Sequence, residues 1–144
     1  DCHNNDATRR NGGPGPDGPH GSIYPWLLEL NYSTTDPTTE SSFQYAMCYK
    51  CHQRSSILGD DSFKEHGKHI RGEATPCSVC HDPHGISTSV ALGTGDHTHL
   101  INFDLSVVTP SSNGLLEFID NGTFAGSCSL TCHGKDHDPF DYNN

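Results

Sequence analysis

The stretch Cys77-Ser78-Val79-Cys80-His81 holds two cysteines three residues apart, followed at once by a histidine. The pattern also occurs at Cys48-Tyr49-Lys50-Cys51-His52 and returns with one extra residue at Cys128-Ser129-Leu130-Thr131-Cys132-His133. Cys-x-x-Cys-His is the spacing that attaches c-type haem. On one helical turn, positions i, i+3 and i+4 project from one face, so two thiols reach the two vinyl groups of one porphyrin while the imidazole takes the iron.

Two other chemistries use paired cysteines. The four thiols of the two intact motifs match a zinc ribbon, but zinc does not require a histidine after each pair, and His52, His81 and His133 all stand there. A thioredoxin-type redox pair is expected within a βαβ pattern, which this chain lacks. Haem attachment is the favoured interpretation, with zinc and redox chemistry as the alternatives.

The third motif is stretched. Its extra residue moves His133 about 100° further around an ideal helix, so the local backbone must deviate if Cys128, Cys132 and His133 hold one haem. Cysteines at i and i+4 make a poor disulfide, however. We therefore expect haem at this motif as well.

The chain opens Asp1-Cys2-His3, which matches the end of a Cys-x-x-Cys-His motif. We expect a truncation or processing point inside a longer multihaem protein, with Cys2 and His3 holding a fourth haem through one thioether. A free amino-terminal thiol or an intermolecular bridge is the alternative.

Composition predicts a chain that is poor in core material. Of 144 residues only 31% are hydrophobic, 15 are glycine and 9 are proline, and the mean hydropathy is −0.64. We expect a single domain or lobe, with a loop-rich part at 1–42 that carries the remnant motif and a region at 43–144 that carries the complete motifs. The predicted fold is mostly irregular, with short α-helices, a small β-hairpin and porphyrins as the core.

The net charge is −10 with neutral histidines, and each haem would add roughly −2 from its propionates. This charge disfavours nucleic acid and anionic membranes and suits basic redox proteins or metal cations. No apolar run reaches membrane-spanning length. Because thioether haem is normally assembled outside the cytoplasm, we expect a periplasmic or extracellular protein; the absence of a leader in the chain indicates a mature form or a fragment.

Local patterns predict a few short elements. Helices are expected at 23–30, from 43 into the first motif, and at 62–69; a strand is expected at 99–108, and a turn at Asn113-Gly114 leads it into a second strand at 115–119. Asn121-Gly122 is a further turn.

The chain has eleven histidines. The three complete motifs and the remnant supply His52, His81, His133 and His3 as proximal iron ligands. Seven remain, enough for every iron to take a second imidazole, although two or three should be only surface or hydrogen-bonded groups. The seven are His20, His66, His69, His84, His97, His99 and His137.

Spacing narrows the choice of distal ligands. On a helix His84 would share a face with His81, and His137 with His133, so each would have to serve a neighbouring haem. His69 precedes the second motif and can fold back over a haem. His20 lies in a loop, held between Pro19 and Gly21. His99 is the first residue of the predicted strand. The predicted distal ligands are thus His20, His69, His84, His99 and His137, with His99 preferred to His97.

Several segments together resemble the multihaem cytochromes of the cytochrome c3/c7 group, in which Cys-x-x-Cys-His is repeated. They are Tyr45–His52, Ser62–Ile70, Cys77–Gly85 with its Cys-His-x-Pro-His-Gly block, His99–Asp104 and Cys128–His137. The likeness covers about residues 43–142, and the opening, with Cys-His followed by Gly-Pro-His-Gly, looks similar too. It implies electron transfer through bis-histidine haems in periplasmic or extracellular chains of metal-respiring microbes. Some relatives polymerise into cytochrome filaments, so partners would be redox proteins, other multihaem cytochromes or further copies of this chain.

The sequence thus predicts an electron carrier and not an enzyme. A multihaem reductase of nitrite, hydroxylamine or a sulfur oxyanion is the main alternative; it needs an open iron position and acid/base groups above it. No Cys-x-x-Cys-Lys motif occurs in the chain. A structural subunit stapled by haems too far apart to conduct is a third class.

Overall fold

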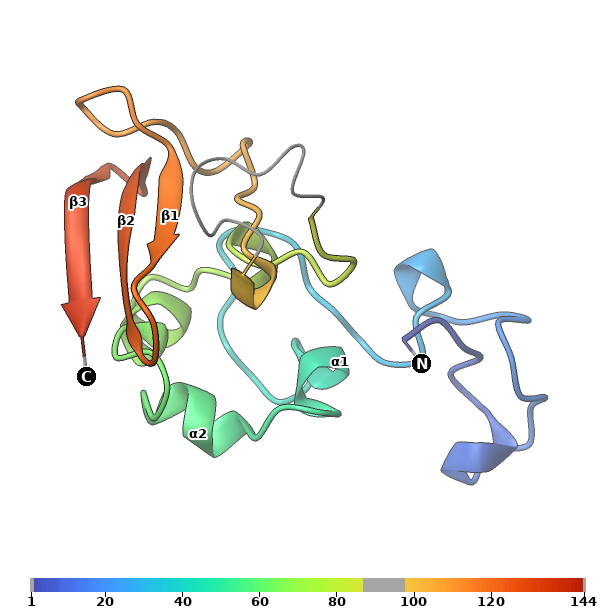
Figure 1. Ribbon diagram of the computed structural model, residues 1–144. Coiled ribbons are helices and arrows are strands. Elements are labelled where there is room, and N and C mark those ends of the chain that lie inside the picture. Colours follow the sequence, from blue (N-terminus) through green and yellow to red (C-terminus); the bar gives the residue numbers. More distant parts are fainter. Residues whose placement is uncertain (1, 87–97, 144) are drawn as a thin grey trace. The chain divides into compact units, whose positions relative to one another are not determined.

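Short elements joined by irregular segments make up the fold (Figure 1). The computed structural model describes residues 2–86 and 98–143. Its elements are the helices α1 (Ala46–Tyr49) and α2 (Arg54–Leu58), the single helical turns η1 (Arg9–Asn11), η2 (Pro25–Leu27), η3 (Lys68–Gly72), η4 (Cys77–Val79) and η5 (Thr98–Leu100), and the strands β1 (Glu117–Asp120), β2 (Ala125–Cys132) and β3 (Lys135–Asn143). The prediction of a largely irregular fold with short helices and a small antiparallel sheet is confirmed. Among the helices of the described residues, none has the length and apolar character needed to cross a membrane.

Contacts divide the chain into two compact units. Unit 1 comprises Asp1–Ser33 and Glu40–Arg54, and unit 2 comprises Thr34–Thr39 and Ser55–Asn144. Each unit therefore contains residues from both of the predicted parts, 1–42 and 43–144. Unit 1 contains the remnant motif and the first intact motif, and unit 2 contains the second and third motifs.

Unit 1 is organised around a buried carboxylate. The side chain of Glu29 is 1% exposed and accepts hydrogen bonds from Lys50 Nζ, at 2.5 Å, and from Asn11 Nδ2. Burial alone would raise the pKa of Glu29, but the bonds from Lys50 and Asn11 outweigh it, and the pKa lies below its usual value. The ionised Glu29 carboxylate thus connects the loop at Asn11 with the first motif, which contains Lys50.

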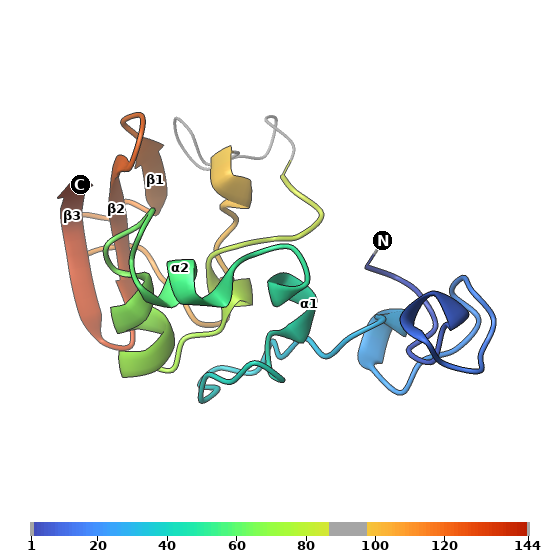
Figure 2. The ribbon, with the colours of Figure 1, turned by 90° about the horizontal axis from the view of Figure 1, so that it is seen from below.

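Unit 2 contains an antiparallel sheet in the order β1-β2-β3 (Figure 1). The predicted Asn121-Gly122 turn is confirmed between β1 and β2: Gly122 has a φ of 100° and donates its N–H to Asp120 Oδ1 at 2.9 Å. Strands β2 and β3 pair with Leu130 opposite His137, and their register shifts between Cys128 and Leu130. The light green turn η3 lies beside the sheet in both views (Figures 1 and 2).

One small apolar cluster forms the core of unit 2. It consists of Val79, Ile101, Phe103, Val108, Phe118 and Leu130. Val79 lies between the two cysteines of the second motif, and Leu130 lies between those of the third. The core therefore fixes the position of both motifs.

The predicted helix at 23–30 is wrong. Only the single turn η2 forms, and Trp26 within it has a φ of 59°, in the left-handed region that ends a helix. Ile23, the first residue of the predicted helix, is 80% exposed. The predicted helix at 62–69 is displaced, since the helical turns begin at His66 and continue to Gly72.

The predicted strand at 99–108 is also wrong. His99 and Leu100 have φ values of 52° and 59°, so the segment starts as a turn, and Ile101 makes only an isolated bridge to His81. The Asn113-Gly114 turn is present, with the Gly114 N–H donating to the carbonyl of Ser111 at 2.8 Å. The strand that follows it pairs with β2 instead of with 99–108.

Candidate haem-ligand sites

The second motif forms a single helical turn. The His81 N–H donates to the carbonyl of Cys77 at 2.9 Å, and the Cys80 N–H donates to the same carbonyl at 3.3 Å. Pro76 precedes the turn and has no N–H to satisfy. Cys77, Cys80 and His81 thus share one turn, which is the arrangement that two-thioether attachment of haem requires.

A backbone carbonyl fixes the protonation of His81. The Nδ1 atom of His81 lies 2.8 Å from the carbonyl oxygen of His99. Since a carbonyl oxygen only accepts, the proton sits on Nδ1 and leaves the lone pair on Nε2. Metal-binding histidines are typically oriented in this way by an outer partner.

A second imidazole, that of His66, lies near His81. The ring centroids of His66 and His81 are 6.4 Å apart. With metal–nitrogen bonds of about 2 Å and each centroid about 1 Å behind its nitrogen, two imidazoles on opposite sides of one ion have centroids about 6 Å apart. The spacing fits a shared iron. His66 was not among the predicted ligands, although its spacing of three residues from His69 was a signal that both rings lie on one helical face.

A similar pair occurs at His69 and His137. Their centroids are also 6.4 Å apart, and Nδ1 of His69 lies 2.7 Å from the carbonyl oxygen of Glu65. Burial, and then the proximity of His69, lower the pKa of His137, so this imidazole is neutral at pH 7 as a metal ligand must be. Aromatic rings that merely pack have similar spacings. The carbonyl-bound Nδ1 in each pair is the feature typical of metal ligands.

Phe63 packs against both pairs. Its ring centroid is 5.0 Å from that of His66 and 6.1 Å from that of His69, and it also contacts Tyr142 of β3 at 4.6 Å. The two candidate iron sites are therefore neighbours that share the segment 63–69.

The third motif lies on a strand, which corrects the expectation that Cys128, Cys132 and His133 form a distorted helical turn. The two cysteines are on β2, four residues and about 13 Å apart along it. Both pack against the apolar core. The set does not fit the standard attachment, because one porphyrin cannot meet both thiols and His133 in this conformation.

His133 belongs to the loop between β2 and β3. It and Gly134 have φ values of 49° and 75°, and this two-residue loop with positive φ at both positions matches a type I′ turn. Nε2 of His133 lies 2.8 Å from Oδ2 of Asp36. The nitrogen that would face iron in the standard arrangement is thus bonded to a carboxylate.

Thiols from two motifs meet at the core. Burial raises the pKa of Cys80 to about 12, and Cys128, Cys132 and Asp36 contribute further. Burial raises the pKa of Cys132 as well. These thiols are therefore neutral at physiological pH in this structure, and the second and third motifs lie side by side.

Unit 1 repeats the local geometry of the second motif. The His52 N–H donates to the carbonyl of Cys48 at 2.9 Å, and Cys51 and His52 are exposed. At the remnant motif, Nδ1 of His3 lies 2.7 Å from the carbonyl oxygen of Trp26. His3 thus donates Nδ1–H to a backbone carbonyl, as His81 does, and Cys2 beside it is exposed.

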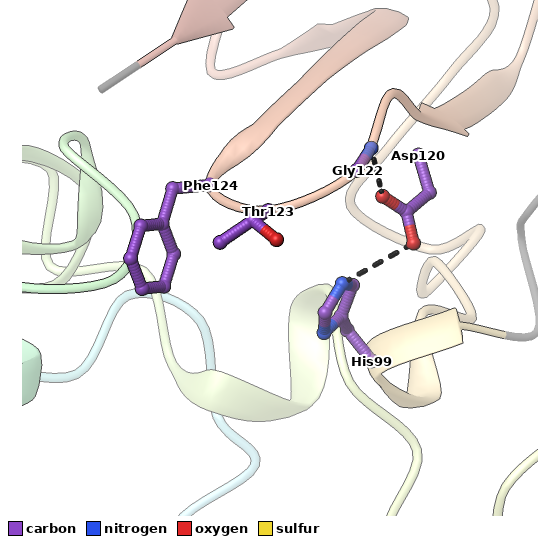
Figure 3. A pocket seen from close by; sticks show the side chains of 5 residues that line it. All are labelled: His99, Asp120, Gly122, Thr123 and Phe124. Atoms are coloured by element: carbon purple, nitrogen blue, oxygen red, sulfur yellow. Dashed lines mark hydrogen bonds and ion pairs between the residues drawn. The ribbon is translucent and has the colours of Figure 1, made fainter.

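The remaining predicted ligands lie at the surface. His20 is exposed in its loop, and the side chain of His84 is 76% exposed with Nδ1 3.4 Å from Asp82. His99 lines an open pocket with Asp120, Gly122, Thr123 and Phe124 and directs Nε2 toward Asp120 at 3.5 Å (Figure 3). What His99 gives to the second motif is its backbone carbonyl. The ligand roles of these three imidazoles stay predictions, and His97 lies outside the described residues.

Residues 2–86 and 98–143 contain no cluster of three or more His, Cys, Asp or Glu side chains able to hold a metal ion. What the structure offers instead is pairs of imidazoles, which suit an iron whose other four ligands come from a porphyrin.

No protein-family model matches the chain, and neither the curated proteins nor the solved structures with which it was compared show significant similarity to it.

Proposed function

We propose that this chain is an exported multihaem c-type cytochrome that transfers electrons and catalyses no reaction at the metal. The observation that carries the proposal is the arrangement at His81. Its motif forms one turn, its Nδ1 donates to the carbonyl of His99, and the centroid of the His66 ring lies 6.4 Å from that of His81, with the two ring planes inclined at 45°.

When bound, a c-type haem supplies an iron that changes oxidation state by one electron. Cys77 and Cys80 would anchor this group, and His81 and His66 would hold its iron, which would leave no place at the metal for a substrate. The carbonyl of His99 keeps the His81 proton on Nδ1 and so maintains the ligating nitrogen.

Electron transfer between sites requires that they lie close together. His66 and His69 belong to one segment, and Phe63 contacts both rings. This spacing favours a row of neighbouring redox centres. It argues against a structural subunit whose haems lie too far apart to conduct electrons.

The charge of −10 supports a basic redox protein as partner. Another multihaem cytochrome, or a further copy of this chain in a filament, is the partner that the resemblance implies.

The reductase alternative has less support. Its best location is the pocket of His99 and Asp120 (Figure 3). A hydrogen bond from Gly122 holds the pKa of Asp120 below its usual value, which makes this carboxylate a poor proton donor at neutral pH. The ring of His66 lies beside that of His81 in the second motif, where we propose that it binds iron and does not act as an acid/base group.

Spectroscopy of the haem-loaded protein tests the proposal. We expect six-coordinate, low-spin iron in both oxidation states, without binding of carbon monoxide. His66→Ala should open one iron, which becomes high-spin and binds carbon monoxide, whereas Lys64→Ala in the same segment should change nothing. A stoichiometric high-spin fraction in the unaltered protein that binds carbon monoxide or nitrite would favour the reductase.

A further inference from the structure

We propose that Asn121, in the loop between β1 and β2, is the acceptor of an N-linked glycan in the folded protein, and that Asn31 is not. The inference rests on the proposed function only through the export of the chain, because N-linked glycans belong to surface loops of exported proteins. It does not depend on the haems.

Two tripeptides of the chain have the acceptor pattern Asn-x-Ser/Thr. They are Asn31-Tyr32-Ser33 and Asn121-Gly122-Thr123, and neither has proline at its centre. The transferase that attaches such glycans recognises the hydroxyl of the third residue, while the amide nitrogen of the asparagine attacks the sugar. Both tripeptides meet this requirement in the sequence, but their surroundings in the structure differ.

The amide of Asn31 is engaged within unit 1. Its Nδ2 donates to the carbonyl oxygens of Phe43 and Gln44, at 3.1 and 3.3 Å, and lies 3.2 Å from Oε1 of Gln44. The backbone is held as well, since the carbonyl of Asn31 accepts from the Met47 N–H at 3.0 Å and the Ser33 N–H donates to the carbonyl of Gln44 at 2.9 Å. The nitrogen that would attack a sugar is therefore held against another segment.

The amide of Asn121 is accessible. Residues 121–124 form the loop and are all exposed. Among the residues that the structure describes, none accepts a hydrogen bond from Nδ2 of Asn121. The loop also borders an open pocket, in which Thr123 is seen with its hydroxyl (Figure 3). Both groups that a transferase must reach are thus at the surface.

The loop can open without loss of the sheet. Two backbone hydrogen bonds close it, from the Asn121 N–H to the carbonyl of Ala125 at 3.0 Å and from the Ala125 N–H to the carbonyl of Gly122 at 3.1 Å. The ladder of β1 and β2 begins only at the next pair, Asp120 with Gly126. Opening a surface loop tip costs little free energy, so a transferase can bind residues 121–123 in the folded chain.

The reaction needs an activated sugar that the chain does not supply, namely an oligosaccharide joined to a lipid through pyrophosphate. A bond forms between Nδ2 of Asn121 and C1 of the first sugar, and the bond between C1 and the pyrophosphate oxygen breaks. The amide gives up one proton, and the lipid pyrophosphate leaves. No group is oxidised or reduced.

The test uses the full chain with its haems, produced in an exporting host whose transferase attaches one oligosaccharide of known mass to Asn-x-Ser/Thr. A flexible tail that ends in Asn-Gly-Thr, added at the carboxyl terminus, reports that this transferase is active. Mass spectrometry is applied to intact glycopeptides, because Asn-Gly also deamidates spontaneously to the aspartate that removal of a glycan leaves. We expect the glycan on the peptide of Asn121 and on the tail, and none on the peptide of Asn31.

Variants identify the attachment atom. Asn121→Gln and Thr123→Ala should each abolish the glycan of this peptide, whereas Thr123→Ser, which keeps a hydroxyl, should retain it. The matched control is Asn113→Gln, in the Asn-Gly turn that is followed by leucine, and it should leave the glycan unchanged. All four variants should keep the haem count of the unaltered chain.

Three results overturn the inference: an unmodified Asn121 beside a modified tail, a glycan at Asn31 in place of Asn121, or a glycan that persists in Asn121→Gln. Haem-loaded protein with any of these results still supports the proposed function. A glycosylated chain without any haem would refute the proposed function and support this inference.

Discussion

The second and third motifs contain the same chemical groups, but they fold differently. Residues 77–81 form a helical turn, whereas residues 128–133 form a strand and a tight turn. A three-residue spacing brings two cysteines to one face of a helix, and a four-residue spacing does so on a strand. One inserted residue therefore changes the backbone on which two thiols align, and it determines whether the next histidine stays with them.

The histidines that end the second and third motifs, His81 and His133, also differ in their hydrogen bonds. His81 donates Nδ1–H to a carbonyl and keeps the lone pair on Nε2, while His133 uses Nε2 to contact Asp36. A histidine that binds a metal almost always donates its other ring N–H, on the nitrogen that faces away from the metal, to an outer partner. The sequence pattern alone does not reveal that partner.

Deleting Thr131 should have the largest effect. The deletion restores Cys-x-x-Cys-His spacing but shifts β2 by one residue and turns its remaining side chains to the opposite face. We expect the free energy of unfolding of the haem-loaded protein to fall by more than about 4 kcal/mol, measured by denaturant titration. The matched control is Thr131→Ala, which keeps the register and removes one hydrogen bond to Asp136. If the deletion variant is as stable as the control, this segment is a helical turn like the second motif.

Leu130→Ala should have the next largest effect. The side chain is 7% exposed in the core cluster, and its truncation should cost about 2–5 kcal/mol in the free energy of unfolding. Val79→Ala, at the equivalent place in the second motif, should cost about 2 kcal/mol because fewer atoms are removed. Leu105→Ala, at a residue that is 65% exposed, is the control. Equal, small losses for all three variants would show that the core does not anchor the motifs.

Asp36→Asn should have the smallest effect. It weakens the contact to His133 and should lower the free energy of unfolding by about 1 kcal/mol. The haem count and the spin state should stay the same, in contrast to the loss of a true iron ligand. Asp61→Asn, at an exposed carboxylate, controls for the change in net charge. A change of spin state in Asp36→Asn alone would place His133 at an iron.

Sequence patterns could predict the parts of this fold that depend on local contacts. The helical turn at the first motif and the Asn121-Gly122 turn depend on interactions between residues that are close in the sequence. The segment 99–108 resembles a strand, because Ile101 and Phe103 are buried and the residues between and just after them are more exposed, yet no strand of residues 2–86 and 98–143 pairs with it beyond one isolated bridge. The cysteine spacing of the third motif predicts a helical turn, so the sequence analysis does not predict strands β2 and β3.

The candidate sites show the same limit. The predicted role of His81 follows from its motif, whereas the carbonyl of His99 and the neighbouring rings of His66 and His69 come from segments that only tertiary structure brings together. The His133-Gly134 pair between an apolar and a charged segment was a turn signal that the haem motif obscured.

Intact mass under denaturing conditions, with peptide mapping of the thioethers, tests the assignment of this chain as a multihaem cytochrome most directly, because covalently attached haem stays with the polypeptide. We predict at least three haem increments above the 15.6 kDa of the chain, one on the peptide of each complete motif, and a fourth if Cys2 is modified. A mass of 15.6 kDa without any increment, from cells able to attach haem, would contradict it.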